Sequence, residues 1–206
     1  MRVYLRVMAA VAGVLALSAL LLAGWQYYRL QKAAEALPVN TRLGGDFLLP
    51  STRGDLLDTA SLRGKVVLLN FGFTSCPDVC PMVLARLKQV LAELGPDAAN
   101  TQVVFVSFDP ERDTIAHMRP YLAHFDPSII GATGSSDEIA AVARQYGVIY
   151  ARQESDSAAG YAFAHSDFIY LIDPAGRVRK LYDTKAPTTD ITADVRTLLA
   201  AQRALF

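Results

Sequence analysis

The residues most suited to chemistry in this sequence are Cys76 and Cys80, which stand four positions apart in the segment FGFTSCPDVCP. They are the only cysteines in a chain of 206 residues. Such a pair can form a structural disulfide, exchange electrons with another thiol pair, or hold a metal ion. If Cys76 lies in the first turn of a helix, both side chains share one helix face and the two sulfurs can converge.

A purely structural disulfide explains this pair poorly. Closing a loop of five residues removes only about 2 kcal/mol of unfolded-state entropy, against about 3 kcal/mol for a loop of fifteen. Redox exchange is a stronger alternative, because cysteine pairs between a strand and a helix are typical of thioredoxin-like oxidoreductases. A peroxidase or redox sensor needs a positive charge beside one cysteine, and the nearest basic residue after Cys80 is Arg86, which disfavours this reading.

A third ligand would distinguish metal binding from redox exchange, and the chain has three histidines. His117 and His124 lie on a predicted helix among charged and polar neighbours, which indicates surface residues. His165 differs, because YAFAHSDFIYLID places it in a loop directly before a buried strand. In a thioredoxin-like sheet that segment faces the cysteine turn. His165 is therefore the candidate third ligand, with an ordinary exposed loop histidine as the alternative.

Alternating strand and helix patterns predict the α/β domain that positions these residues. KVVLLNFGF (65–73) and TQVVFVSF (101–108) are typical of strands buried on both faces, and PMVLARLKQVLAELG (81–95) predicts the helix after the cysteines. Cys76 thus falls between a strand and a helix, where free backbone N–H groups and the positive end of the helix dipole favour a thiolate. The segment 113–125 predicts a second helix that the internal Pro120 bends.

The remaining segments complete a three-layer α/β pattern. FLLP and DLLDTASL predict a short hairpin, and SSDEIAAVARQYG predicts a helix with an N-cap serine. VIYARQE and DFIYLID, followed by VRKLYD, predict antiparallel strands, and TTDITADVRTLLAAQRALF predicts a closing amphipathic helix.

The N-terminus contains nineteen residues without a charge, from Val7 to Trp25. At about 1.5 Å per residue, a helix of this length spans roughly 28 Å, close to the hydrocarbon thickness of a bilayer. Two arginines precede the run and three aromatic residues follow at its far end, which favours an uncleaved anchor: Arg2, Arg6, Trp25, Tyr27 and Tyr28. A cleaved signal peptide is the alternative, although its best cleavage motif, Ala34-Glu35-Ala36, lies well downstream. In both cases the chain that follows the apolar run is exported from the cytoplasm.

Charge composition argues against nucleic acid as a partner. Twenty Lys and Arg balance twenty Asp and Glu, which leaves no basic field for phosphates. The exported domain lies in an oxidising compartment, where cysteines ordinarily form structural disulfides. A single cysteine pair that a structural disulfide explains poorly needs a different role there.

Three segments, in this order behind the apolar N-terminus, resemble the Sco/SenC family of copper chaperones for cytochrome c oxidase assembly: FTSCPDVCP, SFDPERDT (107–114) and His165 before FIYLIDPAGRV. The resemblance covers about residues 40–205, and the joint motif is specific. It implies a thioredoxin-like fold that binds one copper ion through Cys76, Cys80 and His165. Two thiolates and an imidazole form a soft donor set suited to Cu(I), whereas structural zinc normally takes four ligands. Whether Cu(II) is held as well stays open.

The sequence departs from the family pattern at one position. Family members often carry an acidic residue just before the histidine, and Ala164 stands there. Asp167 could substitute, although a surface residue at a strand start is the more ordinary reading. Asp78 is a candidate for tuning the charge of the site, and the alternative is an ordinary exposed residue. Asp109 is a candidate for orienting the site, and the alternative is a turn at the end of a strand. No proline directly precedes His165, which weakens a general oxidoreductase reading.

The sequence therefore predicts an N-terminus and transmembrane anchor over 1–28, a linker over 29–44 and a thioredoxin-like copper-binding domain over 45–206. The expected function is delivery of copper to the CuA centre of oxidase subunit II, with other copper chaperones or thiol reductants as further partners. The expected location is a single-pass inner membrane protein whose C-terminal domain is periplasmic. The alternative is a thiol-disulfide reductase that keeps the cysteines of subunit II reduced through a redox-active Cys76–Cys80 disulfide.

Overall fold

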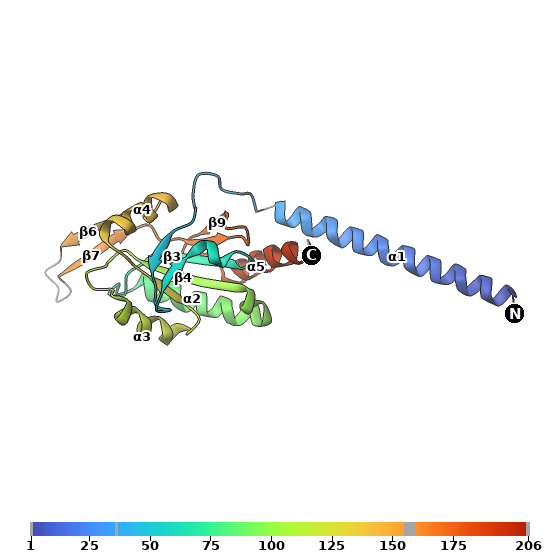
Figure 1. Cartoon of the computed structure of the whole chain (residues 1–206), viewed down its shortest axis with the longest axis horizontal. Coiled ribbons are helices and arrows are strands. Elements are labelled where there is room, and N and C mark those ends of the chain that lie inside the picture. The colour runs from blue at the N-terminus through green and yellow to red at the C-terminus, as the bar shows by residue number, and fades with distance from the viewer. Residues whose placement is uncertain (1, 36, 155–159, 205–206) are drawn as a thin grey trace.

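A five-stranded mixed sheet, in the order β5-β4-β3-β8-β9, lies at the centre of the domain that carries the cysteines. The computed structural model describes residues 2–35, 37–154 and 160–204, and Figure 1 shows its elements. The strands are β3 (Val66–Gly72), β4 (Thr101–Ser107), β5 (Ile130–Ala132), β8 (Ile169–Ile172) and β9 (Val178–Tyr182). β3 pairs in parallel with β4 and antiparallel with β8. Every residue of β3 and β4 is buried, as their continuous apolar runs predict.

Helices cover both faces of this sheet, which confirms the predicted three-layer arrangement. One face, which carries Leu68 and Phe105, packs against α2 (Val79–Leu94), α3 (Ile115–Phe125) and α5 (Thr188–Arg203). The opposite face, which carries Leu69 and Phe71, packs against α4 (Ser136–Tyr146) and the predicted hairpin of β1 (Leu48–Pro50) and β2 (Leu56–Asp58). Two short 3-10 helices among the described residues are η1 (Thr59–Leu62) and η2 (Gly95–Asn100).

A separate antiparallel hairpin consists of β6 (Tyr150–Glu154) and β7 (Tyr161–His165). Figure 1 shows this hairpin at the end of the domain opposite α1 (Arg2–Glu35). The predicted pairing of VIYARQE with DFIYLID is wrong, because the intervening YAFAH is itself a strand and pairs with β6. YAFAH is only five residues long and mostly half-exposed, so it lacks the longer, fully buried apolar run of β3 and β4. The predicted antiparallel pairing of β8 with β9 is confirmed.

The N-terminal helix α1 is longer than the predicted anchor. Its segment Arg6–Arg29 has a mean hydropathy of 2.4 and is long and apolar enough to cross a membrane, a test that a signal sequence also passes. Residues 29–35, predicted as linker, are helical. The next residues lie on the domain, because Leu37 is buried against the core and the Asn40 amide donates to the Val178 carbonyl at 2.8 Å. Ala36 of the alternative cleavage motif lies outside the described residues.

Candidate metal centre

The two cysteines lie on the turn that joins β3 to α2. Cys76 stands three residues before α2 begins at Val79, and Cys80 is the second residue of that helix. Cys76 therefore lies between the strand and the helix, as predicted, and Cys80 lies inside the helix and not just before it. The turn itself brings the cysteines together: the Cys76 amide donates to the Phe73 carbonyl at 3.3 Å, and the Cys80 amide donates to the Cys76 Sγ at 3.5 Å.

Gly72, the last residue of β3, makes room for the cysteine side chains. A Cβ atom at this position would lie 2.8 Å from the Cys80 Sγ and 2.9 Å from the ring of Phe105. Ordinary contacts of a Cβ atom are longer than this, so any other residue would displace the buried Cys80 thiol. Glycine is therefore required here for space and not for an unusual backbone angle.

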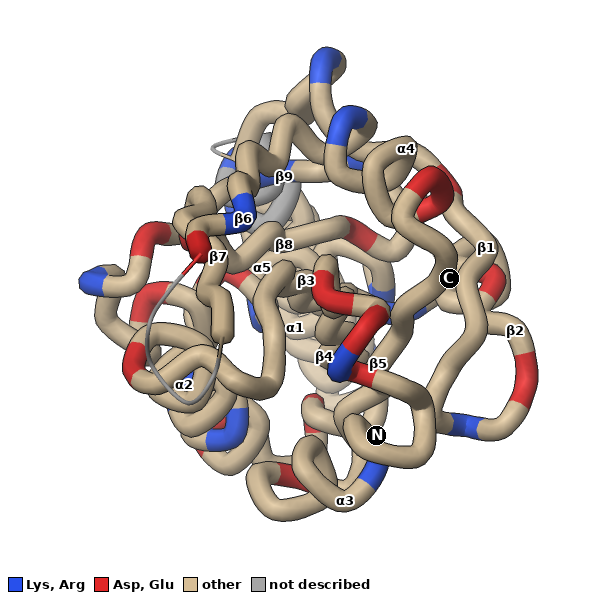
Figure 2. The backbone as a smooth tube through the Cα atoms, turned by 90° about the vertical axis from the view of Figure 1, so that its left-hand side faces the viewer, with Lys and Arg blue, Asp and Glu red and all other residues tan. Residues whose placement is uncertain are grey.

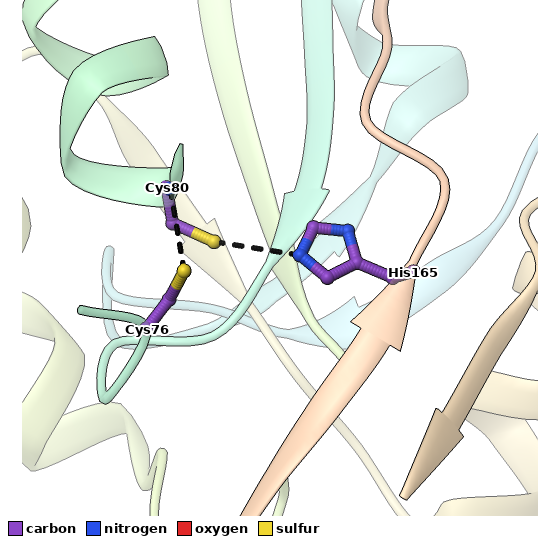
Figure 3. A group of neighbouring side chains, drawn as sticks. All are labelled: Cys76, Cys80 and His165. Atoms are coloured by element: carbon purple, nitrogen blue, oxygen red, sulfur yellow. Dashed lines mark hydrogen bonds between the residues drawn. The ribbon is translucent and has the colours of Figure 1, made fainter. Parts of the chain in front are cut away.

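His165 completes a cluster of three possible ligands, as Figure 3 shows. Its Nε2 lies 3.8 Å from the Cys80 Sγ, and the ligand atoms of Cys76, Cys80 and His165 all lie within 4.8 Å of one another. Cys80 is buried and Cys76 is half-buried, while the His165 side chain is 5% exposed. His165 is the last residue of β7 and not part of a loop, which corrects the expected local structure. The expected contact with the cysteine turn is present.

Aromatic rings attach the β6–β7 hairpin to the sheet and surround His165. The His165 ring centroid lies 4.9 Å from that of Phe108 and 6.0 Å from that of Phe73. Phe163, on β7, meets both of these rings edge-on at 5.1 and 5.4 Å. This apolar shell limits water around the imidazole and fixes the ring, so that Nε2 faces the sulfurs.

Asp109 connects to the hairpin and not to the three ligands. Its carboxylate is 1% exposed and accepts from the Tyr161 hydroxyl at 2.7 Å and from the Arg112 Nε at 2.5 Å. The Arg112 guanidinium lies 3.6 Å from the Tyr161 ring centroid and donates to the Tyr161 carbonyl at 3.0 Å. Asp109 therefore orients the strand that ends in His165. Asp78 is exposed, stands at the N-cap of α2 and makes no capping hydrogen bond with its side chain.

Asp113 fixes the cysteine turn, a role that the sequence analysis missed. Its fully buried carboxylate accepts from the Thr74 amide at 2.8 Å, from the Thr74 hydroxyl, and from the Ser107 hydroxyl at 2.5 Å. His117 is exposed, as predicted, yet its Nε2 lies 3.1 Å from the Thr74 hydroxyl oxygen. His124 is exposed. The available signal was the second aspartate of SFDPERDT, which stands at the start of the predicted helix 113–125.

The charge of the metal-free site is concentrated on Cys76. Hydrogen bonding from the Cys80 thiol holds the pKa of Cys76 far below its ordinary value, with His165 and the backbone N–H groups of Cys80 and Asp78 adding to this and burial opposing it. The pKa of Cys80 is raised, because its proton bonds to the Cys76 sulfur and because the thiol is buried. Reduced protein therefore carries a thiolate on Cys76 and a thiol on Cys80.

The imidazole of His165 is held in an orientation that suits a ligand. Burial lowers the pKa of His165, but the Cys76 sulfur, the Ser166 carbonyl and Asp167 together raise it above the ordinary value. The Ser166 carbonyl oxygen lies 3.1 Å from Nδ1. A proton on Nδ1 can donate to this carbonyl, which leaves the lone pair of Nε2 directed at the sulfurs.

Comparisons with known proteins agree with this geometry. Residues 35–200 match the SCO1/SenC family. The chain is 41% identical over 180 residues to the mitochondrial SCO2 homolog of Bos taurus, covering 86% of this chain and 68% of that protein. It is similar to the copper-bound structure of Bradyrhizobium japonicum ScoI, with a TM-score of 0.71 and 38% identity over 76% of this chain and 99% of that one.

A third relative was solved in connection with a disulfide switch. This is BsSco, a member of the Sco family of cytochrome c oxidase assembly proteins, with a TM-score of 0.63 and 26% identity over 79% of this chain and 96% of that one. These neighbours confirm the expected thioredoxin-like α/β fold. Because the match spans most of its length, the chain belongs to the SCO1/SenC family.

Proposed function

We propose that this protein is a membrane-anchored copper metallochaperone that acts in cytochrome c oxidase assembly and delivers copper to the CuA centre of subunit II. The observation that carries the proposal is the convergence of Cys76, Cys80 and His165, whose ligand atoms lie within 4.8 Å of one another. Members of the same family have been solved with copper bound. The recipient rests on the family resemblance alone.

The chemistry of the donor set fits copper. Thiolates are soft ligands that select Cu(I), and imidazole suits copper in either common oxidation state. Among the described residues, the cluster has no fourth ligand from a histidine, cysteine or carboxylate side chain, whereas structural zinc takes four ligands. Three ligands hold the ion and leave a side from which a partner can approach. The partly buried site thus combines binding with release.

Transfer proceeds by ligand exchange in this proposal. The Cys76 thiolate is the more accessible sulfur, so it is the first to meet copper from a donor and the first that a recipient's thiolate displaces. Cys80 loses its proton on binding, because coordination by the metal lowers the pKa of a thiol. His165 coordinates through Nε2 in its neutral form, so any proton on that nitrogen is released on binding. Thiol–disulfide exchange with a disulfide of another protein, which is reduced to two thiols, converts Cys76 and Cys80 to a disulfide and closes the site, and a dithiol reductant reverses this exchange and reopens it.

The apolar part of α1 supports a single-pass anchor in the inner membrane with the copper-binding domain in the periplasm. In this arrangement residues 1–28 form the anchor, 29–44 the linker and 45–206 the domain. The helical residues 29–35 then extend α1 beyond the bilayer. Copper donors and thiol reductants would meet the domain on that side of the membrane.

The competing function is a thiol-disulfide reductase that acts on the cysteines of subunit II. The low pKa of Cys76 favours it, because a thiolate is the attacking species in disulfide exchange. A reductase needs only the two sulfurs, whereas a three-ligand copper site also needs His165. The two functions therefore make different predictions for His165→Ala.

The test combines copper titration and thiol redox potential of full-length protein with oxidase activity in cells. We expect reduced wild-type protein to bind one copper ion per chain and no stoichiometric zinc. His165→Ala should lose at least the 10- to 100-fold in copper affinity that outer-shell changes cause, keep its disulfide exchange with glutathione nearly intact and fail to support the oxidase. His124→Ala, at an exposed position of α3, is the control. Oxidase activity that survives when His165→Ala no longer binds copper supports the reductase instead.

A further inference from the structure

Asp167 lies in the turn between β7 and β8 with its carboxylate close to the back of the His165 ring. The Asp167 Oδ1 is 3.8 Å from the His165 Nδ1, on the ring edge away from the cysteines. The Asp167 side chain is only 21% exposed, and Oδ1 is buried without a hydrogen-bond partner among the described residues. A charged residue at the start of a strand ordinarily lies in solvent, so the burial of this carboxylate requires an explanation.

Burying a carboxylate oxygen without a partner is costly. An unsatisfied buried acceptor destabilises the folded state, and a charged one does so more than a neutral one. Among the described residues, His165 is the one basic side chain within ion-pair distance of Asp167. At 3.8 Å the two side chains are close enough to interact electrostatically but too far apart for a direct hydrogen bond.

The arrangement matches the usual support of a metal-binding histidine. A ligating imidazole commonly donates its second N–H to a carboxylate or a carbonyl, which fixes the ring and raises its basicity. Here the Ser166 carbonyl oxygen, 3.1 Å from Nδ1, lies within hydrogen-bond distance, and the Asp167 carboxylate, at 3.8 Å, lies beyond it and adds a negative charge on the same side of the ring. The residue before the histidine cannot serve, because Ala164 is exposed and has no polar side chain.

We propose that Asp167 is a positioning residue that holds His165 toward the two sulfurs and makes the site favour Cu(II) relative to Cu(I). This inference rests on the proposed copper site. A negative charge behind the imidazole offsets positive charge at the metal, and Cu(II) carries one more positive charge than Cu(I). Loss of the charge should therefore weaken Cu(II) binding more than Cu(I) binding.

The first test measures both copper affinities of full-length protein in detergent for wild type, Asp167→Asn and Asp167→Glu. We expect Asp167→Asn to lose 10- to 100-fold in Cu(II) affinity, the range for outer-shell changes, with a smaller loss for Cu(I). Each tenfold difference between the two losses raises the reduction potential of the bound copper by about 59 mV. The thiolate-to-Cu(II) absorption should shift or weaken. Asp167→Glu keeps the charge and should restore most of the Cu(II) affinity.

Asp78→Asn is the matched control, because it removes the same charge two residues from Cys76 without a contact to His165. A Cu(II) loss in Asp78→Asn as large as in Asp167→Asn overturns the proposal in favour of a general charge effect. Equal losses of Cu(I) and Cu(II) in Asp167→Asn, or no recovery in Asp167→Glu, also overturn it.

A measurement without copper separates this inference from the proposed function. Nitrogen-15 NMR of the His165 ring in reduced, metal-free protein reports which ring nitrogen carries the proton. We expect the form protonated on Nδ1 to fall in Asp167→Asn and to be retained in Asp167→Glu and Asp78→Asn. Unchanged ring signals in Asp167→Asn exclude a positioning role. If wild-type protein binds no copper while these signals change as expected, the copper function fails and the contact between Asp167 and His165 stands.

Discussion

The Nε2 of His165 lies 3.8 Å from the Sγ of Cys80, although 85 positions separate the two residues in the sequence. The cysteine belongs to a helix packed on the central sheet, whereas the histidine ends a hairpin outside that sheet. Their distance therefore depends on the contacts that attach the hairpin to the domain. These contacts are the aromatic rings around Phe108 and the hydrogen bonds of Asp109.

Tyr161→Phe tests the attachment of the hairpin. The substitution removes the hydroxyl that donates to the buried Asp109 at 2.7 Å and leaves that carboxylate with one donor fewer. We expect a local cost of about 1 to 3 kcal/mol and weaker copper binding, because β7 no longer holds His165 as firmly. The thiol redox potential should stay unchanged, since the cysteine turn does not contact this hydroxyl. Copper titration and redox equilibration with glutathione measure the two effects.

Tyr150→Phe is the control for this experiment. Tyr150 lies on the partner strand β6 and packs its ring on Phe108 at 5.0 Å, and its hydroxyl has no hydrogen-bond partner among the described residues. Its loss should leave copper affinity near the wild-type value. Equal effects of the two substitutions would mean that the hydroxyl of Tyr161 does not position the hairpin.

Asp113→Asn tests the support of the cysteine turn. The buried carboxylate accepts from the Thr74 amide and from two hydroxyls, and an amide group cannot accept all three hydrogen bonds. We expect a loss of about 1 to 3 kcal/mol in the free energy of unfolding, and each kcal/mol lowers Tm by about 2 to 4 °C for a domain of this size. Thermal unfolding of reduced protein measures it.

The exposed Asp137 on α4 provides a matched substitution, Asp137→Asn, whose effect should stay within the few tenths of a kcal/mol that a helix-dipole charge contributes. If Asp113→Asn unfolds at the same temperature as Asp137→Asn, the hydrogen bonds of Asp113 do not stabilise the turn.

The central strands and the cysteine pair could be predicted from sequence because their signals are local. The continuous apolar runs of β3 and β4 indicate strands covered on both faces, and a strand followed by a helix places Cys76 and Cys80 in the joining turn. Local sequence did not determine where α2 begins. That start depends on how the turn folds around Thr74 and its bonds to Asp113, a contact across 39 positions.

The surroundings of His165 could not be predicted in the same way. YAFAH is short and mostly half-exposed, so its strand signal is weak, and its attachment depends on aromatic contacts with residues far along the chain. Asp167 shows the same limit, because a charged residue before a strand ordinarily lies in solvent. Its burial follows from the turn that joins the hairpin to β8, which no local pattern of residues specifies.

Membrane attachment can be tested directly on α1. If the apolar segment Arg6–Arg29 is an uncleaved anchor, full-length protein should stay in the membrane fraction after a carbonate wash. N-terminal sequencing of the mature protein provides the comparison. Recovery of soluble protein with a new N-terminus near Ala36 would show that the segment is a removed signal peptide.

The charge on Cys76 predicts an unusual pH dependence of thiol reactivity. The pKa of Cys76 lies far below its ordinary value, so the thiolate persists as the pH falls, whereas an ordinary thiol with a pKa of about 8.5 becomes tenfold less reactive for each pH unit below that value. We expect iodoacetamide to modify Cys76 of reduced, copper-free protein at nearly the same rate between about pH 8 and pH 5. Cys80, whose pKa is raised and which is buried, should react much more slowly. Mass spectrometry of the modified peptides distinguishes the two positions.

His165→Ala removes one of the groups that lower the pKa of Cys76, so the rate of Cys76 modification should begin to fall at a higher pH in this variant than in wild type. A wild-type rate that drops tenfold for each unit below pH 8 would show that Cys76 is an ordinary thiol and would remove the basis for its role as the first sulfur to meet copper.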